Sequence, residues 1–298
     1  MSLIEIGGRN YLLYLVLPHP MKIALLSGES RARLDRINSG FNERAYSGEG
    51  AEEYDRIHRY EGDAQHEYPA RLLVEKVWGA GTRPGSVGDY GRALEIGAGS
   101  GYFTTLIARR ARSVVAVEPV VDMQNVIRAR CNAEGLDNVE VVGATAFDLN
   151  RHVPAASIDS AFVIQSLHHF HRRPEVFVEL GRVVRPGGRL YLVEPHHNLR
   201  RVARLARKYR RVYRALEFRA AERHWATHDF LTRGELRALC RRGGFDSVRI
   251  DSYWIPYSRR LIPSPERRFH LERILGRVPL FRHFGAVLAM EARRNASR

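Results

Sequence analysis

The chain has 298 residues, of which 44% are hydrophobic, and a formal net charge of +15 at pH 7. The length suits one large domain or a domain with a cap, and the hydrophobic share is that of an ordinary globular protein. The two cysteines are too few for a disulfide framework and lack the spacing of a metal site, so a reducing, cytoplasmic compartment is expected. The basic excess favours anionic partners: nucleic acid, acidic lipid or an acidic substrate.

The N-terminal part of the sequence predicts an extension and a cap. The apolar run at 11–17 is far too short to span a bilayer, and no secretion signal is expected. Met21 is an alternative start, which would make the first twenty residues dispensable. The polar stretch that follows indicates short helices, with a better-defined helix over 65–77.

From residue 92 onward, apolar runs alternate with helical segments. This alternation is typical of a parallel sheet covered by helices on both faces. Strands are expected at 92–96, 113–118, 139–142, 158–164, 189–194, 247–251 and 286–292, and helices at 102–110, 121–134, 174–184 and 232–242. Two segments, 196–229 and 253–283, fall outside the alternation and are expected as insertions above the ligand-binding edge of the sheet.

The stretch RALEIGAGSGYF places three glycines, Gly97, Gly99 and Gly101, between an expected strand and an expected helix. Glycine removes the Cβ that would block a ligand, and backbone N–H groups converge at such a turn. A plain tight turn is the alternative. A dinucleotide fingerprint needs its third glycine at position 102, which holds Tyr102, so a different nucleotide-type ligand is favoured.

The next strand ends in Glu118. A carboxylate at that strand end can accept hydrogen bonds from both ribose hydroxyls of an adenosine. The competing interpretation is an ordinary exposed acid at the end of a strand.

Four stretches in order, LEIGAGSG, VVAVEP, SIDSAFVIQSLHHF and LGRVVRPGGRLYLVEP, carry a family resemblance. The sequence resembles the class I S-adenosylmethionine-dependent methyltransferases, in the branch of ubiquinone/menaquinone-type and small-molecule enzymes. The resemblance implies an α/β, Rossmann-like fold with a seven-stranded, mostly parallel sheet, helices on both faces and an antiparallel last strand. Residues 1–65 would be the N-terminal extension and helical cap, and 66–298 the S-adenosylmethionine-binding domain, with inserted lid segments at about 196–229 and 253–283.

The resemblance also implies S-adenosyl-L-methionine as the cofactor. Glu95 would lie near its amino-acid end, and Glu118 would take the ribose hydroxyls. Many family members have an Asp that contacts adenine after the third strand, where this chain has Ala144; Asp148 is a substitute or an ordinary turn acid. The cofactor-binding residues that the resemblance implies are Glu95, Gly97, Ala98, Gly99, Gly101, Glu118, Pro119, Ala144, Thr145, Ala146, Phe147 and Gln165.

The predicted reaction transfers a methyl group to a small acceptor, for which a lipophilic molecule is one candidate. Positioning supplies much of the catalysis, and a base is needed only where the acceptor holds its proton. His168 and His196 are the predicted bases, chosen from the histidines of LHHFH and EPHHN, with a packing role as the alternative for each. No metal site is expected, because adjacent histidines point in different directions. RNA or DNA methylation and a non-catalytic cofactor-binding protein of the same fold remain alternatives.

The region 199–219 has an apolar helical stripe and an opposite face of Arg and Lys. It fits a lid helix over the active site, peripheral contact with an anionic membrane, or nucleic-acid binding. Tyr46 and Tyr54 fit a gate that closes over cofactor and acceptor, or ordinary packing of a cap.

Overall fold

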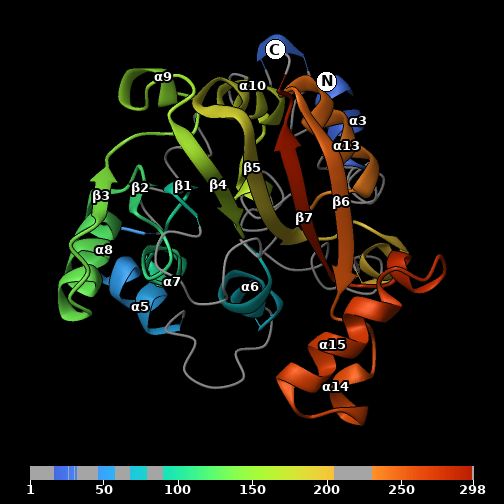
Figure 1. Ribbon diagram of the computed structural model, residues 1–298. Helices are drawn as coiled ribbons and strands as arrows, with labels where there is room; N and C mark the ends of the chain where they lie inside the picture. The colour runs from blue at the N-terminus through green and yellow to red at the C-terminus, as the bar shows by residue number, and fades with distance from the viewer. Residues whose placement is uncertain are drawn as a thin grey trace.

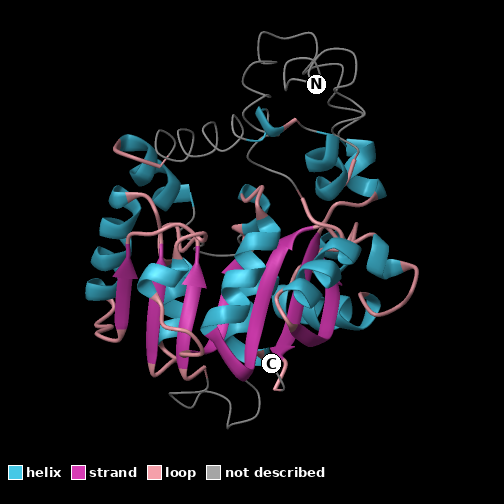
Figure 2. Ribbon diagram, turned by 90° about the horizontal axis from the view of Figure 1, so that it is seen from above, coloured by secondary structure: helices cyan, strands magenta, loops and turns pink. Residues whose placement is uncertain are grey.

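The computed structural model describes residues 17–25, 27–29, 31, 46–57, 68–78, 90–204 and 230–296. Its centre is one seven-stranded sheet in the order β3-β2-β1-β4-β5-β7-β6 (Figures 1 and 2). The strands are β1 (Arg92–Ile96), β2 (Ser113–Val117), β3 (Val139–Val142), β4 (Ile158–Ile164), β5 (Val184–Pro195), β6 (Phe245–Tyr253) and β7 (Val287–Arg294). Strands β1 to β5 pair in parallel, and β7 runs antiparallel to β5 and β6, which confirms the predicted topology.

Helices cover both faces of the sheet. Successive strand residues alternate between two apolar clusters. Leu94 and Val163 belong to the cluster that includes side chains of α10 (Arg173–Val183) and α13 (Arg233–Arg242). Ala93 and Phe162 belong to the cluster that includes side chains of α6 (Tyr68–Leu72) and α7 (Tyr102–Ala108). The helices that follow strands are α7 (Tyr102–Ala108), α8 (Val121–Ala133), α9 (Leu149–His152), the 3-10 turn η2 (Leu167–His169), α10 (Arg173–Val183) and α13 (Arg233–Arg242).

Further helices precede and follow this alternation. Before it come α3 (His19–Leu25), α5 (Glu49–Ile57), α6 (Tyr68–Leu72) and the π-helical turn η1 (Leu73–Val77). Between β6 and β7 lie α14 (Ser258–Leu261), α15 (Pro265–Leu275) and η3 (Phe281–His283). The second expected insertion is therefore helical. Of the first, residues 199–204 are helical, and the rest up to 229 lies outside the described residues.

Two elements differ from the expectation. The helix expected over 65–77 is described from Tyr68 and turns π-helical at Leu73. Strand β5 begins at Val184, five residues earlier than expected, because Val184 pairs with Ile158 before the register shifts at a bulge. The RPGG stretch therefore lies inside the strand, with Gly187 in the left-handed region at φ 75°. The division at residue 65 stays a prediction.

The topology fixes where a ligand can bind. From β1 the chain proceeds to β2 and β3 on one side, and then to β4 and β5 on the other, so the strand order reverses between β1 and β4. Ligands of open α/β sheets bind at such a point, outside the carboxyl ends of the strands. Strand β6, antiparallel to β7, ends at the same edge, and α14 and α15 follow it there (Figure 1).

Candidate functional site

The glycine turn after β1 is shaped by close approaches on two sides. All three glycines have positive φ: 70° at Gly97, 55° at Gly99 and 77° at Gly101. A Cβ on Gly97 would lie 2.6 Å from Cβ of Ser166, and one on Gly101 would lie 3.2 Å from Cα of Ile127 in α8. For a Cβ on Gly99, the nearest atoms would belong to the Tyr54 side chain, the closest at 3.6 Å. Gly97 and Gly101 thus allow Ser166 and α8 to pack closely against the turn, while Gly99 faces Tyr54 of the N-terminal cap.

Two buried carboxylates flank this turn. Glu118, at the end of β2, accepts hydrogen bonds from the backbone N–H of Gly99 at 2.9 Å and of Val120 at 3.0 Å. Burial raises the pKa of Glu118 to about 7. Glu95, within β1, accepts a hydrogen bond from the Thr104 hydroxyl at 2.6 Å, and burial raises its pKa to about 8. Glu95 therefore ties α7 to β1.

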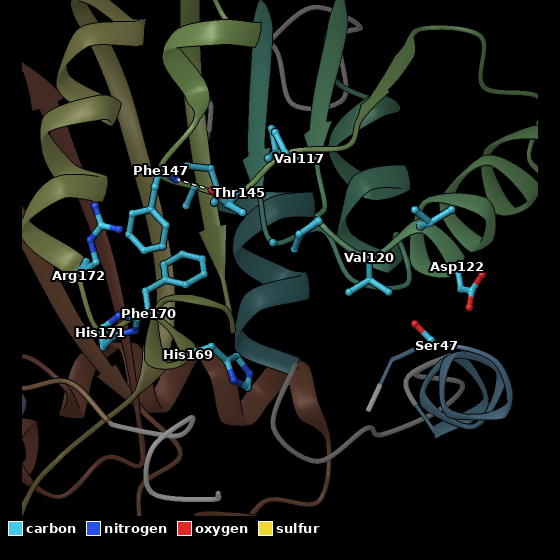
Figure 3. A pocket seen from close by; sticks show the side chains of 16 residues that line it. Ser47, Val117, Val120, Asp122, Thr145, Phe147, His169, Phe170, His171 and Arg172 are labelled. Carbon is cyan, nitrogen blue, oxygen red and sulfur yellow. Dashed lines mark hydrogen bonds between the residues drawn. The ribbon is translucent and has the colours of Figure 1, made fainter. Parts of the chain in front are cut away.

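Two adjoining cavities open beside the turn. The larger, of about 560 Å³, lies between the ends of β1 and β2, the segment 144–147 after β3, and the turn 169–172 (Figure 3). The smaller, of about 80 Å³, is lined among others by Gly99 and Glu118. Both are lined by Gly97, Pro119, Val120, His169 and Phe170. They form one continuous region at the switch point of the sheet.

The turn after β4 brings a strained residue to the smaller cavity. Gln165 has φ 55°, a backbone conformation that few non-glycine residues adopt. Its backbone N–H donates to the Val193 carbonyl at 2.8 Å. Its side-chain Nε2 is buried and has no hydrogen-bond partner within the part of the chain that the structure describes. Gln165 lines the smaller cavity, so this amide can donate to a ligand there.

This turn is held from behind by a carboxylate at the end of β5. Glu194 is fully buried and accepts hydrogen bonds from the backbone N–H of Ser166 at 2.8 Å and of Leu167 at 2.6 Å. Its other oxygen lies 2.7 Å from Nδ1 of His168. Burial raises the pKa of Glu194 to about 8. His168 is thereby directed to the protein interior.

A buried arginine completes the support of the turn. The Arg173 guanidinium donates to the carbonyls of Phe170 at 2.9 Å and Leu167 at 3.2 Å. It also pairs with Glu235 of α13 at 2.6 Å, and both side chains are almost fully buried. Glu194 and Arg173 thus fix the backbone on either side of His169, whose side chain lines both cavities.

Aromatic side chains form one wall of the larger cavity. The rings of Phe147 and Phe170 are 6.2 Å apart, and the Arg172 guanidinium lies 4.6 Å from the centre of the Phe147 ring. Figure 3 shows these side chains together with His171 beside the cavity. Such a wall suits a flat or apolar ligand.

The N-terminal cap closes the other side. Tyr46 and Tyr54 line the smaller cavity, and their rings pack edge to face with centres 5.0 Å apart. The cap is fixed to α8 at two points: the N–H of Gly48 donates to Asp122 at 2.7 Å, and Asp55 forms an ion pair with Arg130. This placement fits both alternatives that the sequence leaves open, a tyrosine gate and ordinary packing of the cap, so the gate stays a prediction.

Residues 94–192 match a family model described as a methyltransferase domain. This part of the chain is therefore a methyltransferase domain by similarity. An uncharacterised methyltransferase of Mycobacterium tuberculosis is 36% identical over 102 residues, which are 34% of this chain and 39% of that protein. The 27-O-demethylrifamycin SV methyltransferase of Amycolatopsis mediterranei is 36% identical over 114 residues, 38% of this chain and 41% of that protein. The chain therefore spans about two fifths of the length of these relatives.

A solved methyltransferase has the same fold. Phosphoethanolamine N-methyltransferase 2 of Haemonchus contortus, in complex with S-adenosyl-L-methionine, matches with a TM-score of 0.57 at 15% identity, over 87% of this chain and 60% of that one. The resemblance to methyltransferases and the fold predicted from the sequence are thus confirmed. No helix in the described ranges is long and apolar enough to cross a membrane.

Most of the predicted cofactor residues of the methyltransferase domain meet at these cavities. Those that line them are Gly97, Gly99, Glu118, Pro119, Ala144, Thr145, Ala146, Phe147 and Gln165. Three others support the site from outside: Glu95 ties α7 to β1, Ala98 packs against α8, and Gly101 lets α8 approach α7. Asp148 accepts a hydrogen bond from the Thr145 hydroxyl at 2.6 Å and does not line either cavity.

The two predicted bases lie apart from the cavities. His168 is paired with Glu194. His196 is buried, its Nδ1 lies 3.0 Å from the Gly285 carbonyl oxygen, and burial lowers its pKa to about 4. Neither lines either of the two cavities beside the glycine turn, so a catalytic role for either stays a prediction; His169 and His171 of the LHHFH motif do line the larger one. Among the described residues, no group of three or more His, Cys, Asp or Glu could hold a metal ion.

The sequence interpretation missed several lining residues. Phe170 and Arg172 follow the histidines in LHHFHRR, where only the histidines drew attention. Ser47 and Asp122 come from the cap and the first turn of α8, and their meeting depends on the docking of the cap. No local sequence signal marks that contact.

Proposed function

We propose that this chain transfers a methyl group from S-adenosylmethionine to a small, lipophilic acceptor. The observation that carries the proposal is the lining of the two adjoining cavities. A glycine backbone, a strand-end carboxylate and an unpartnered buried amide meet there beside an apolar wall.

The residues present fit the cofactor. Gly99 leaves room for a ligand against bare backbone, and Glu118 presents acceptor oxygens for ribose hydroxyls. Val120, Ala144 and Phe147 offer an apolar slot that suits a purine ring. When bound, the cofactor would supply an activated sulfonium methyl group.

The part of this slot that would contact the adenine amino group differs from that of many family members. Ala144 provides no carboxylate for an adenine amino group, and Asp148 is held by Thr145 outside the cavity. Adenine recognition would therefore depend on backbone groups of 144–147 and on packing, with Glu118 as the principal polar anchor.

The acceptor would meet His169 where the cavities join. His169 lines both, and its backbone is fixed through Glu194 and Arg173. An imidazole there can take the proton of a hydroxyl acceptor, because its ordinary pKa of about 6.5 is close to neutral pH. For an acceptor with a free lone pair, the same side chain would act by orientation.

The apolar wall favours a lipophilic acceptor over a nucleotide chain. Phe170 and Val121 line the larger cavity beside the slot proposed for the purine ring, and the cavity volume of about 560 Å³ lies within the range for small-molecule sites.

The first test is calorimetric titration with S-adenosylhomocysteine, with NAD as the control. Binding of S-adenosylhomocysteine alone is expected, and the variant Gly99→Arg, which fills the space between the turn and Tyr54, should not bind. Glu118→Gln is a second variant in case Gly99→Arg does not fold. Binding of neither ligand by the wild type would refute the proposal. Transfer of isotope-labelled methyl to a panel of apolar alcohols, amines and lipids, compared with RNA, then identifies the acceptor class.

A further inference from the structure

The segment between β6 and β7 has an unusual surface. Within residues 253–284, exposed large apolar side chains occur on α14, at the end of α15, and around η3. They are Tyr257, Leu261, Ile274, Val278, Leu280, Phe281 and Phe284, seven of the eleven such side chains in the described residues. We call this surface the α14–η3 face. A concentration of this kind marks an interaction site.

The same segment is strongly basic. It contains seven arginines and two glutamates. Glu266 is paired with Lys76 of η1 at 2.6 Å, and Glu272 is fully buried. The exposed charge of the segment is therefore carried mainly by arginines, among them Arg259, Arg260 and Arg277.

Hydrogen bonds order α14 and join the two ends of the segment. Tyr257 and Leu261 lie one helical turn apart, with the Leu261 N–H donating to the Tyr257 carbonyl at 3.2 Å. The Arg200 side chain donates to the carbonyls of Trp254 at 2.9 Å and Phe284 at 3.4 Å. It thereby joins the start of the segment, its end, and the short helix at 199–204, where Leu199 is 78% exposed.

A buried carboxyl group anchors the face to the rest of the domain. Glu272 of α15 accepts hydrogen bonds from the N–H of Trp254 at 2.7 Å and of Ile255 at 3.2 Å, and from the hydroxyls of Tyr68 and Ser258. The ring of Tyr253 stacks on Phe269 with centres 5.2 Å apart. The exposed apolar side chains therefore stand on an ordered base.

We propose that the α14–η3 face docks on an anionic lipid bilayer. Protruding Leu, Phe and Tyr side chains suit the boundary between headgroups and acyl chains, and arginines beside them suit lipid phosphates. Nucleic acid would match the charge alone and leave Leu261 and Leu280 exposed. A second copy of this chain would bring the same arginines together in a symmetric dimer, which repulsion disfavours.

The α14–η3 face lies at the same edge of the sheet as the cofactor cavities, which gives docking a role in the reaction. This role rests on the proposed function. Strand β6 ends at the same sheet edge as β1 and β4, so the face and the cofactor cavities share one edge of the molecule (Figure 1). Docking would hold the methyltransferase site close to a membrane-dissolved acceptor.

The test is co-sedimentation of the full chain with phosphatidylglycerol vesicles and with phosphatidylcholine vesicles. Binding to the anionic vesicles alone, weakened by salt, is expected. The variant Leu261→Asp and the double variant Arg259→Gln/Arg260→Gln should each lower vesicle affinity at least about tenfold. The matched controls are Val178→Asp, exposed on α10, and Arg241→Gln/Arg242→Gln, an exposed pair at the end of α13; both should bind as the wild type does.

Three outcomes would overturn the docking proposal. The first is that the wild type does not bind anionic vesicles, and the second is that the control variants lose as much vesicle affinity as the test variants. The third is that, in a parallel RNA-binding assay, the test variants lose affinity for RNA and keep their affinity for vesicles. S-adenosylhomocysteine binding is measured on every variant to show that the cofactor site is intact. If the wild type binds vesicles but not S-adenosylhomocysteine, the docking face stands and the proposed function fails.

Discussion

The ends of β2 and β5 carry two carboxylates with similar surroundings and different exposure to the cavities. Glu118 accepts backbone N–H groups from the glycine turn, and Glu194 accepts them from the turn after β4. Burial raises the pKa of both, to about 7 and about 8. Glu118 lines a cavity, whereas His168 covers the second oxygen of Glu194. Of these two strand-end acids, only Glu118 is therefore open to a ligand in the cavity.

The largest expected effect is on stability, at Glu194. Glu194→Ala leaves the N–H groups of Ser166 and Leu167 and the ring nitrogen of His168 without their acceptor in a dry interior, which should cost about 4 kcal/mol of unfolding free energy. Glu118→Ala should cost about 1 kcal/mol, because water in the cavity can bind the N–H groups of Gly99 and Val120. Urea denaturation measures both, and equal losses would contradict the distinction.

The next largest effect is expected on kcat, and it distinguishes the adjacent residues His168 and His169. His169→Gln should lower kcat about a hundredfold with unchanged S-adenosylhomocysteine affinity, if the acceptor gives up a proton. His168→Gln should mainly lower the unfolding free energy, since His168 contacts Glu194 and does not line a cavity. Steady-state kinetics with the identified acceptor, and the pH profile of kcat, decide between them. A larger kcat loss in His168→Gln would restore the base predicted from the sequence.

These histidines show how far sequence reasoning reaches. Buried β-branched runs predicted the sheet, and the glycine turn with Glu118 at the next strand end predicted where the cavity opens. The side of the turn that each histidine faces is set by Glu194 and by the Arg173–Glu235 pair, whose members are 62 residues apart. Such distant contacts leave no local pattern, so His169, Phe170 and Arg172 could not be placed. The bulge in β5 is hidden for the same reason, because it depends on pairing with Ile158.

A smaller effect is the pH dependence of S-adenosylhomocysteine affinity, which the protonation of Glu118 should cause. Its pKa of about 7 means that the ligand-free protein holds this carboxyl largely protonated below pH 7. Ribose hydroxyls that donate to Glu118 favour its charged form, so S-adenosylhomocysteine affinity should fall by up to about tenfold per pH unit below pH 7 and level off above it. Glu118→Gln should flatten this profile. Calorimetry between pH 5.5 and pH 8.5, about three units, measures it.

The same shift has a stability consequence with a definite sign. The folded pKa of Glu118 lies above the ordinary carboxyl value of 4.5, so the folded state binds the extra proton. Its contribution to stability is greatest below pH 4.5 and is lost as pH rises through about 7. Glu118→Gln should therefore raise the Tm of the ligand-free protein at pH 8 while it weakens ligand binding. A fall in Tm would mean that the charged carboxylate is stabilised by its N–H donors more than burial costs.

The smallest expected effect is at the cap. Tyr54 lies against Gly99 and packs edge to face with Tyr46, so Tyr54→Ala should remove about 1 kcal/mol of contact energy and weaken S-adenosylhomocysteine binding about fivefold. Asp55→Ala, which breaks the ion pair with Arg130, loosens the whole of α5 and should reduce affinity further. Calorimetry separates two uses of the tyrosines. Loss of cofactor affinity means that they close over the cofactor, whereas unchanged affinity with a raised KM for the acceptor means that they bind the acceptor, and the site where the methyl group is received then lies on the cap side of Gly99.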